Sequence, residues 1–176
     1  MLRSICLHGP ESTGKSTIAP RLAAHLGGVC IDEYGRTYCE TYGTDLAMAD
    51  LVAIARGHDA RVHAALAAGR GPLILDTDPL MTAVWADMLF ARRDPWFDAW
   101  HDTADLYLLF DIDLPWQEDG TRMFGAAADR ARFFDLSRRE LERRQVPWRL
   151  ISGEGEARWR AVLAAIEDYA SVRDMD

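Results

Sequence analysis

The sequence GPESTGKS at residues 9–16 is the feature that most restricts how this chain can fold. It matches the pattern G-x-x-x-x-G-K-[ST], in which glycines let the backbone curl so that its N–H groups point at phosphate oxygens. A short apolar run from Ser4 to His8 precedes it, and a helical pattern from Lys15 to Leu26 follows it. A strand, a glycine-rich loop and a helix in this order predict a phosphate-binding loop, or P-loop, in a parallel α/β sheet.

The chemistry of the loop assigns a role to each of its residues. Lys15 is expected to reach the β- and γ-phosphates of a triphosphate, ATP by default, and to act in catalysis. Ser16 is expected to offer its hydroxyl to Mg²⁺, while the following helix adds the positive end of its dipole. The predicted nucleotide-binding residues are Gly9, Glu11, Ser12, Thr13, Gly14, Lys15, Ser16 and Thr17.

Strand-like and helix-like segments alternate along the rest of the chain. Further strands are expected at residues 29–31, 72–75, 106–110 and 148–151. Helices are expected at 48–68, from Pro79 to about 90, from Pro95 to about 100, at 129–145 and at 156–172. This order predicts a parallel five-stranded sheet with helices on both faces. The 176 residues suit one domain spanning 1–176.

Composition and charge narrow the function classes. The sequence contains no apolar run of the roughly 20 residues needed to span a bilayer, and its N-terminus reaches the P-loop too soon for a signal peptide. A net charge of -8 speaks against nucleic acid as the main partner. The three cysteines show no metal-ligand or disulfide spacing. We therefore expect a cytoplasmic enzyme with no membrane or nucleic-acid partner.

Carboxylates follow two of the predicted strands. Asp76 and Asp78 follow the third strand, where a P-loop enzyme needs a carboxylate near magnesium. Asp76 is predicted to bind the magnesium ion and to act in catalysis. Asp78 is a candidate for substrate contact or, equally, for the N-cap of the next helix. Asp32 and Glu33 end the second strand, at the edge where an open α/β sheet binds its ligands. Either could hold or deprotonate an acceptor hydroxyl, and the alternative is a helix-start carboxylate or a salt bridge with Arg36.

Arginines gather after the fourth strand, in a segment that also contains Gly120 and Gly125. Kinases of small molecules close a lid over ATP, which excludes water and adds positive charge beside the transferred phosphoryl group. Residues 111–125 are expected to be a polar loop. Residues 112–132 are predicted to form a small helical lid, with Arg122 and Arg130 as catalytic residues. The remaining arginines are expected on a solvated helix face, at positions Arg138, Arg139, Arg143 and Arg144.

Taken together, the motifs resemble a known family. GPESTGKST, EYGRTY at 33–38, LDTD at 75–78 and PWQEDGTR at 115–122 with DR at 129–130 resemble the ribosylnicotinamide kinase domain of the NadR family. The resemblance covers residues 3–152. It implies a P-loop kinase-like fold, transfer of the ATP γ-phosphate to the 5′-hydroxyl of nicotinamide riboside, and Mg²⁺ as cofactor. It also implies that Glu33 and Arg36 face the acceptor and that Arg122 and Arg130 belong to the lid.

The chain also departs from that family. It has neither the adenylyltransferase nor the DNA-binding segment of full-length members, so adenylyl transfer and repression are not expected. Asp32 stands where the family often has a tryptophan suited to stack on a nicotinamide ring. The predicted acceptor-binding residues are Asp32, Glu33, Tyr34, Arg36 and Asp78. An aromatic acceptor would need a stacking partner, and Trp85, Trp96, Trp100 and Trp116 are candidates for such a pocket or, alternatively, for the core.

Three functions remain open from the sequence. The first is a nucleoside kinase acting on nicotinamide riboside, the second is a regulatory P-loop ATPase, and the third is a kinase of another nucleoside or small hydroxyl metabolite. The carboxylates after the second strand and the lid arginines favour a kinase, which could be a homo-oligomer.

Overall fold

In a computed structural model, which describes residues 2–118 and 122–173, five strands form one parallel sheet. Its order is β2–β3–β1–β4–β5, and every neighbouring pair runs parallel. The strands are β1 (Ser4–His8), β2 (Val29–Ile31), β3 (Leu73–Asp76), β4 (Leu106–Phe110) and β5 (Trp148–Ile151). The predicted sheet is confirmed, with β3 shifted by one residue.

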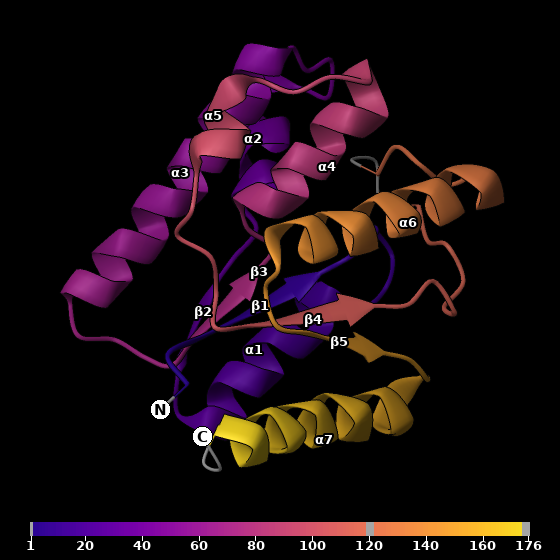
Figure 1. The fold of residues 1–176 in the computed structure, drawn as a ribbon. Helices are drawn as coiled ribbons and strands as arrows, with labels where there is room; N and C mark the ends of the chain where they lie inside the picture. Colours follow the sequence, from indigo (N-terminus) through magenta and orange to yellow (C-terminus); the bar gives the residue numbers. More distant parts are fainter. Residues whose placement is uncertain (1, 119–121, 174–176) are drawn as a thin grey trace.

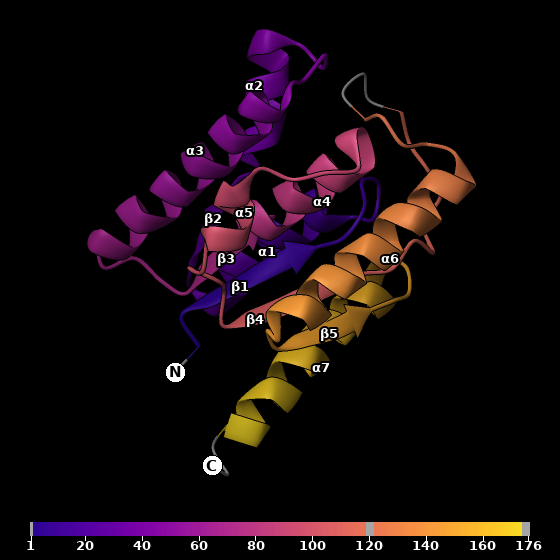
Figure 2. The ribbon, with the colours of Figure 1, turned by 45° about the horizontal axis from the view of Figure 1, so that its top comes forward.

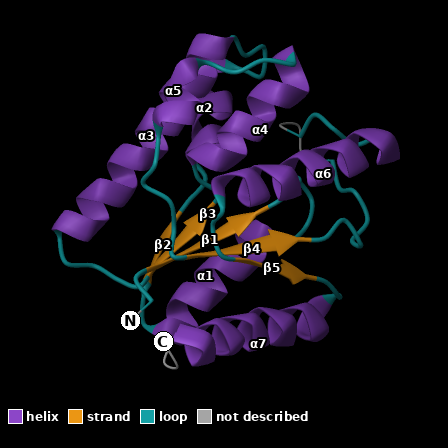
Figure 3. Cartoon of the chain, viewed as in Figure 1, coloured by secondary structure: helices purple, strands orange, loops and turns teal. Residues whose placement is uncertain are grey.

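Helices cover both faces of this sheet (Figures 1 and 3). On one face lie α1 (Lys15–Leu26) and α7 (Gly155–Arg173), and on the other lie α3 (Met48–Ala67), α4 (Pro79–Phe90), α5 (Pro95–Ala99) and α6 (Ala127–Arg144). The crossover helices connect parallel strands, as a sheet of this type requires. Among the described residues, no helix is both long and apolar enough to cross a membrane.

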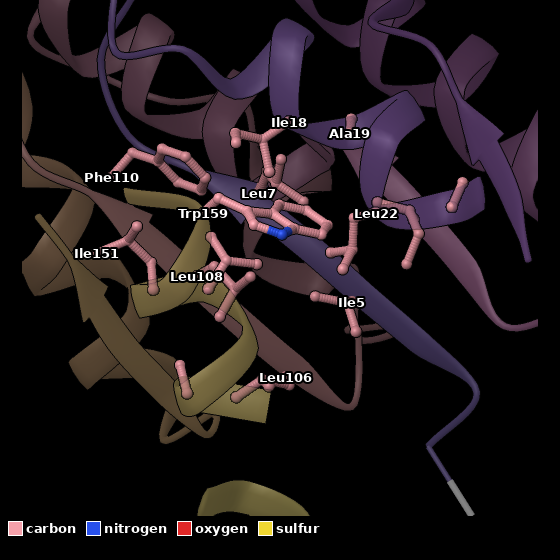
Figure 4. Close-up of a cluster of buried hydrophobic side chains, with 14 of the residues drawn as sticks. Ile5, Leu7, Ile18, Ala19, Leu22, Leu106, Leu108, Phe110, Ile151 and Trp159 are labelled. Carbon is pink, nitrogen blue, oxygen red and sulfur yellow. The ribbon is translucent and has the colours of Figure 1, made fainter. Parts of the chain in front are cut away.

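The core is divided between the two faces because successive strand residues point to opposite sides. Ile5 and Leu7 of β1 belong to the cluster under α1 and α7, whereas Cys6 belongs to the cluster on the other face. Figure 4 shows Trp159 of α7 beside Leu7 in the first cluster. Every residue of β4 is fully buried, as expected for a strand covered on both faces. This packing fixes the sheet, and with it the loops at the carboxyl ends of the strands.

One helix was missed by sequence reasoning. No helix was expected between the second strand and residue 48, but α2 (Tyr34–Tyr42) lies there, beside α3 at the β2 edge (Figure 2). None of its residues is fully buried, so it lacks the strong apolar stripe that identifies an amphipathic helix. Its first turn also contains Gly35, which weakens the helical signal.

The polar loop predicted at residues 111–125 is confirmed for its described residues, so only the end of the predicted lid is helical. Residues 112–118 and 122–126 form loops and turns, residues 119–121 of the predicted range lie outside the described part, and a helix begins only at Ala127. The loop folds onto itself at Gly125, where a Cβ atom would stand 2.9 Å from the ring of Trp116. Pro115 and Gly125 both disfavour helix here. Only residues 127–132, the start of α6, are the helical part of the predicted lid.

Arg144 does not lie on a solvated face as expected. Its side chain is 8% exposed, and its Nε donates to the carboxylate of Glu140 at 3.0 Å. The same carboxylate accepts a 2.6 Å bond from Arg93 beyond the end of α4. Glu140 is itself buried, so the arginine one turn later is drawn into the interface between α6 and α5. Arg138, Arg139 and Arg143 remain partly exposed, as predicted.

Candidate active site

A cavity opens at the carboxyl ends of β1, β2 and β3. All eight predicted nucleotide-binding residues line it, together with Glu33, Arg36 and Arg122. The topology explains this, because the loops that follow neighbouring parallel strands meet at one edge of the sheet. The structure therefore brings the P-loop, the β2–α2 junction and part of the lid segment into one site.

The P-loop backbone adopts conformations that favour glycine at two positions. Gly9 has φ 123°, and a Cβ atom there would stand 2.8 Å from the carbonyl oxygen of Phe110. Gly14 has φ 86° and forms the N-cap of α1. Ser12 also takes a positive φ, 60°. The hydroxyl of Thr13 closes the curl by donating to the Pro10 carbonyl at 2.9 Å.

Lys15 lies inside this curl. Its Nζ atom donates to the carbonyl oxygens of Gly9 at 2.9 Å and Pro10 at 2.6 Å, and the residue is 8% exposed. Burial lowers the pKa of Lys15, and the charge of Asp76 opposes that shift. The ammonium group is thus held at the loop's centre, where an anionic phosphate group would replace solvent around it.

Asp76 and Ser16 supply oxygen ligands of the kind that Mg²⁺ prefers. Asp76, the last residue of β3, is 5% exposed, and its Oδ1 atom has no hydrogen-bond partner among the described residues. Ser16 is exposed and lines the cavity. A buried carboxylate oxygen without a donor fits a site completed by a hydrated cation. The residues present therefore fit the expected metal, although Asp76 itself stands just behind the cavity lining.

Glu33 is the carboxylate that faces the cavity from β2. It forms the N-cap of α2, and burial, followed by the charge of Asp76, raises the pKa of Glu33 to about 7. The charges of Lys15 and Arg36 act in the opposite direction. A carboxyl group with this pKa can accept a proton at neutral pH. Arg36 lines the cavity one helical turn later.

The lid segment is held onto the P-loop by two P-loop side chains. The hydroxyl of Ser12 accepts bonds from the Gln117 N–H at 2.8 Å and from Arg122 at 3.1 Å. The carboxylate of Glu11 accepts bonds from the N–H groups of Met123 at 3.1 Å and Phe124 at 3.4 Å. Arg122 thereby reaches the P-loop, as its predicted role requires.

Arg130 lies deeper than Arg122. It is 9% exposed, donates to the Leu114 carbonyl at 2.9 Å and does not line the cavity. Its Nε atom is buried and has no partner among the described residues. The structure therefore shows Arg130 supporting the start of the lid segment.

Three predicted acceptor contacts are not supported by the geometry. Asp78 is 2% exposed, and its carboxylate accepts from the Leu80 N–H at 2.9 Å and from the Tyr107 hydroxyl at 2.5 Å. It is the N-cap of α4, which was the alternative reading. One carboxylate oxygen of Asp78 caps the helix and the other accepts from the Tyr107 hydroxyl, so Asp78 does not reach the cavity.

The other two residues point away from the cavity. Asp32 is exposed, and its described bond comes from the Cys30 thiol at 3.6 Å. Tyr34 packs its ring against Gly57, with the Arg61 guanidinium 4.6 Å from the ring centre. Neither lines the cavity. Adjacent residues of extended chain point to opposite sides, so Glu33 faces inward and Asp32 does not.

The cavity has an apolar wall, of which the sequence indicated only Trp85 as a candidate for pocket or core. Trp85, the one aromatic residue among the described lining residues, lies on α4 and packs its ring against Phe124 and Phe133 at 5.2 Å each. The wall is completed by Cys39, Leu46, Leu51, Ile54, Met81 and Met123. The helical spacing of Leu51 and Ile54 was visible, but periodicity does not distinguish a core face from a cavity face. A flat apolar ring would fit this wall beside Glu33.

Two proteins of known identity are similar to this chain in sequence. The chain is 30% identical over 151 residues to the trifunctional NAD biosynthesis/regulator protein NadR of Escherichia coli strain K12, covering 82% of this chain and 37% of that protein. The Salmonella typhimurium strain LT2 protein of the same name is 31% identical over 141 residues, covering 77% and 34%. The chain thus spans about a third of the length of these relatives.

Solved structures share the fold. A NadR protein crystallised in complex with NR has a TM-score of 0.78 at 23% identity, covering 96% of this chain and 50% of that chain. Thymidylate kinase from Ehrlichia chaffeensis has a TM-score of 0.70 at 16% identity, covering 93% and 96%. These likenesses confirm the predicted P-loop kinase-like fold.

A family model described as an AAA domain matches residues 4–158, which contain the P-loop, all five strands and the lid segment. The resemblance to NadR that the motifs predicted is confirmed by the two curated relatives. The chain belongs to this AAA-domain family.

Proposed function

We propose that this protein is an ATP-dependent kinase that phosphorylates the 5′-hydroxyl of nicotinamide riboside, giving nicotinamide mononucleotide. The observation that carries the proposal is one cavity that joins a complete P-loop to Glu33, Arg36 and an apolar wall containing Trp85. The names of the similar proteins support it, since they include a regulator of NAD biosynthesis and a NadR structure in complex with NR.

The donor half uses the P-loop and β3. The backbone N–H groups of residues 9–17 and the ammonium of Lys15 hold the triphosphate of ATP. Ser16 and Asp76 would hold Mg²⁺, which would supply positive charge to neutralise the phosphates of ATP. Another NadR structure, in complex with NAD and AMP-PNP, supports a nucleotide at such a site.

The acceptor half uses Glu33. Its carboxylate accepts the proton of the 5′-hydroxyl as that oxygen bonds to the γ-phosphorus, the bond from this phosphorus to the β–γ bridging oxygen breaks, and ADP leaves. A pKa of about 7 lets Glu33 be ionised before transfer at neutral pH. The base of the nucleoside lies against Trp85 and its apolar neighbours, where ring stacking and burial stabilise it.

The lid segment supplies positive charge and excludes water. We propose that Arg122 contacts the transferred phosphoryl group, and its bond to Ser12 of the P-loop supports this role. We assign Arg130 to the same function through its support of Leu114. We further propose that residues 1–176 act as one kinase domain in the cytoplasm, with a small-molecule partner, no nucleic-acid partner, and possible self-association.

Acceptor dependence tests the proposal. Purified protein with Mg²⁺ and ATP should form ADP rapidly only when nicotinamide riboside is added, and more slowly with other nucleosides. ADP formation at the same rate with and without any nucleoside would instead indicate a regulatory ATPase. Preferential turnover of another nucleoside would overturn the assigned acceptor.

A further inference from the structure

Arg158, near the start of α7, connects three segments around the P-loop. It is 2% exposed. Its Nη1 atom donates to the carbonyl oxygen of Thr13 at 2.8 Å, and its Nε atom donates to the Gly153 carbonyl at 2.6 Å. Its Nη2 atom donates to the carboxylate of Asp113, which follows β4. One buried guanidinium thus holds the P-loop, the β5–α7 turn and the first residues of the lid segment.

The bond to Thr13 has a direct consequence for the next peptide N–H. The bond between Thr13 and Gly14 is trans, and in a planar trans peptide the C=O and N–H groups point in opposite directions. Since the Thr13 oxygen points toward the Arg158 guanidinium, the Gly14 N–H points to the opposite side of the peptide, away from that guanidinium. Gly14 lines the cavity beside Lys15. A charged donor on the carbonyl also polarises the amide and strengthens its N–H as a donor.

Asp113 stabilises this arrangement. Besides the bond from Arg158, its second oxygen accepts the Gly153 N–H at 2.6 Å. A buried guanidinium without an anionic partner would strongly destabilise the folded protein. The Asp113 carboxylate supplies that partner. Two of the three bonds of Arg158 go to backbone carbonyls. An apolar side chain of similar volume could fill the same space, but it has no donors and would not hold these carbonyls in place.

We propose that Arg158 is a positioning residue for the phosphate donor: by holding the Thr13 carbonyl it aims the Gly14 N–H at the nucleotide phosphates. Asp113 is its charge partner. The inference rests on the nucleotide site of the proposed function and does not depend on which acceptor is phosphorylated.

The test is the affinity for ADP, measured by titration calorimetry with no acceptor present. Arg158→Lys keeps the charge but has no planar fork of donors, so it cannot reproduce the three bonds. ADP should bind about tenfold more weakly to this variant, as expected when a bond to a charged group is lost. The KM for the acceptor at saturating ATP should not change. A matched control is Glu156→Gln, which removes the exposed α1–α7 pair with Arg21 and should leave ADP affinity unchanged.

Unchanged ADP affinity in a folded Arg158→Lys protein would overturn the inference. If that variant does not fold, Asp113→Asn replaces it: the amide loses the charge and one acceptor, and ADP should bind about threefold more weakly. Unchanged affinity there would equally overturn it. Because no acceptor is used, failure of the nucleoside assay would overturn the proposed function alone.

Discussion

The guanidinium of Arg122 donates a hydrogen bond of 3.1 Å to the hydroxyl oxygen of Ser12, joining the lid segment to the P-loop. The same hydroxyl accepts the Gln117 N–H at 2.8 Å. A single P-loop side chain therefore bonds to both Gln117 and Arg122 of the lid segment. Because the lid segment excludes water from the proposed reaction, this junction is expected to control whether the phosphoryl group reaches the nucleoside or water.

Replacing Ser12 tests this junction. In Ser12→Ala both bonds to the lid segment are lost, so kcat/KM for the nucleoside should fall about tenfold and the fraction of ATP hydrolysed without transfer should rise. The measurement compares ADP formed with phosphorylated nucleoside formed. Ser171→Ala, on the exposed end of α7, is the control and should behave as the unaltered protein. Full coupling in Ser12→Ala would contradict the assigned role of the junction.

Chemical modification of Lys15 can be measured directly because it is the only lysine in the sequence. Burial lowers its pKa, which raises the share of reactive neutral amine at a given pH. An amine-reactive ester should modify Lys15 and the N-terminal amine, and Mg²⁺ with ADP should slow only the first reaction. Mass spectrometry of peptides measures both rates, and the N-terminus serves as internal control. Equal modification of Lys15 with and without saturating nucleotide would show that it does not contact the phosphates.

The ionisation of Glu33 is expected to set the pH dependence of kcat/KM for the nucleoside. The proposed base must be ionised, and its pKa is raised to about 7, so kcat/KM for the nucleoside should rise from about pH 6 to pH 8 with a midpoint near 7. Glu33→Gln should lower kcat about a hundredfold and remove this limb. Glu40→Gln, an exposed position on the same helix, should preserve both rate and profile. A Glu33→Gln enzyme that retains the limb would exclude Glu33 as the base.

Replacing Trp85 is expected to weaken binding of the nucleoside without changing binding of ADP. Trp85→Leu removes the ring from the cavity wall, so KM for the nucleoside should rise about tenfold while ADP affinity stays unchanged. Trp85→Phe keeps a ring in contact distance of Phe124 and should recover most of the loss. A similar KM in the leucine variant would show that the nucleoside binds elsewhere in the cavity.

Local features of the sequence were sufficient to predict the strands and the P-loop. The apolar runs of β1 and β4 and the glycines of GPESTGKS act within a few residues, so their structures follow from neighbouring residues alone. The placement of Lys15 and Glu33 in one site followed as well, since parallel strands present their carboxyl ends at the same edge.

The remaining features depend on contacts between distant residues. Arg158 bonds to Thr13, 145 positions earlier, and no sequence pattern links them. Asp78 fitted both a substrate contact and a helix cap until Tyr107 of β4 was placed against it. Trp85 fitted both a pocket and the core, because its helical spacing is the same whether its face meets the core or a cavity.

The identity of the product tests the central proposal most directly. The protein is incubated with Mg²⁺, ATP and nicotinamide riboside, and the product is compared with authentic nicotinamide mononucleotide by chromatography and phosphorus NMR. One mole of nicotinamide mononucleotide per mole of ADP is predicted, with the new phosphate on the 5′-oxygen, and Lys15→Ala should lower its rate by at least about a hundredfold. Absence of this product under conditions where the protein binds ADP would contradict the proposed function.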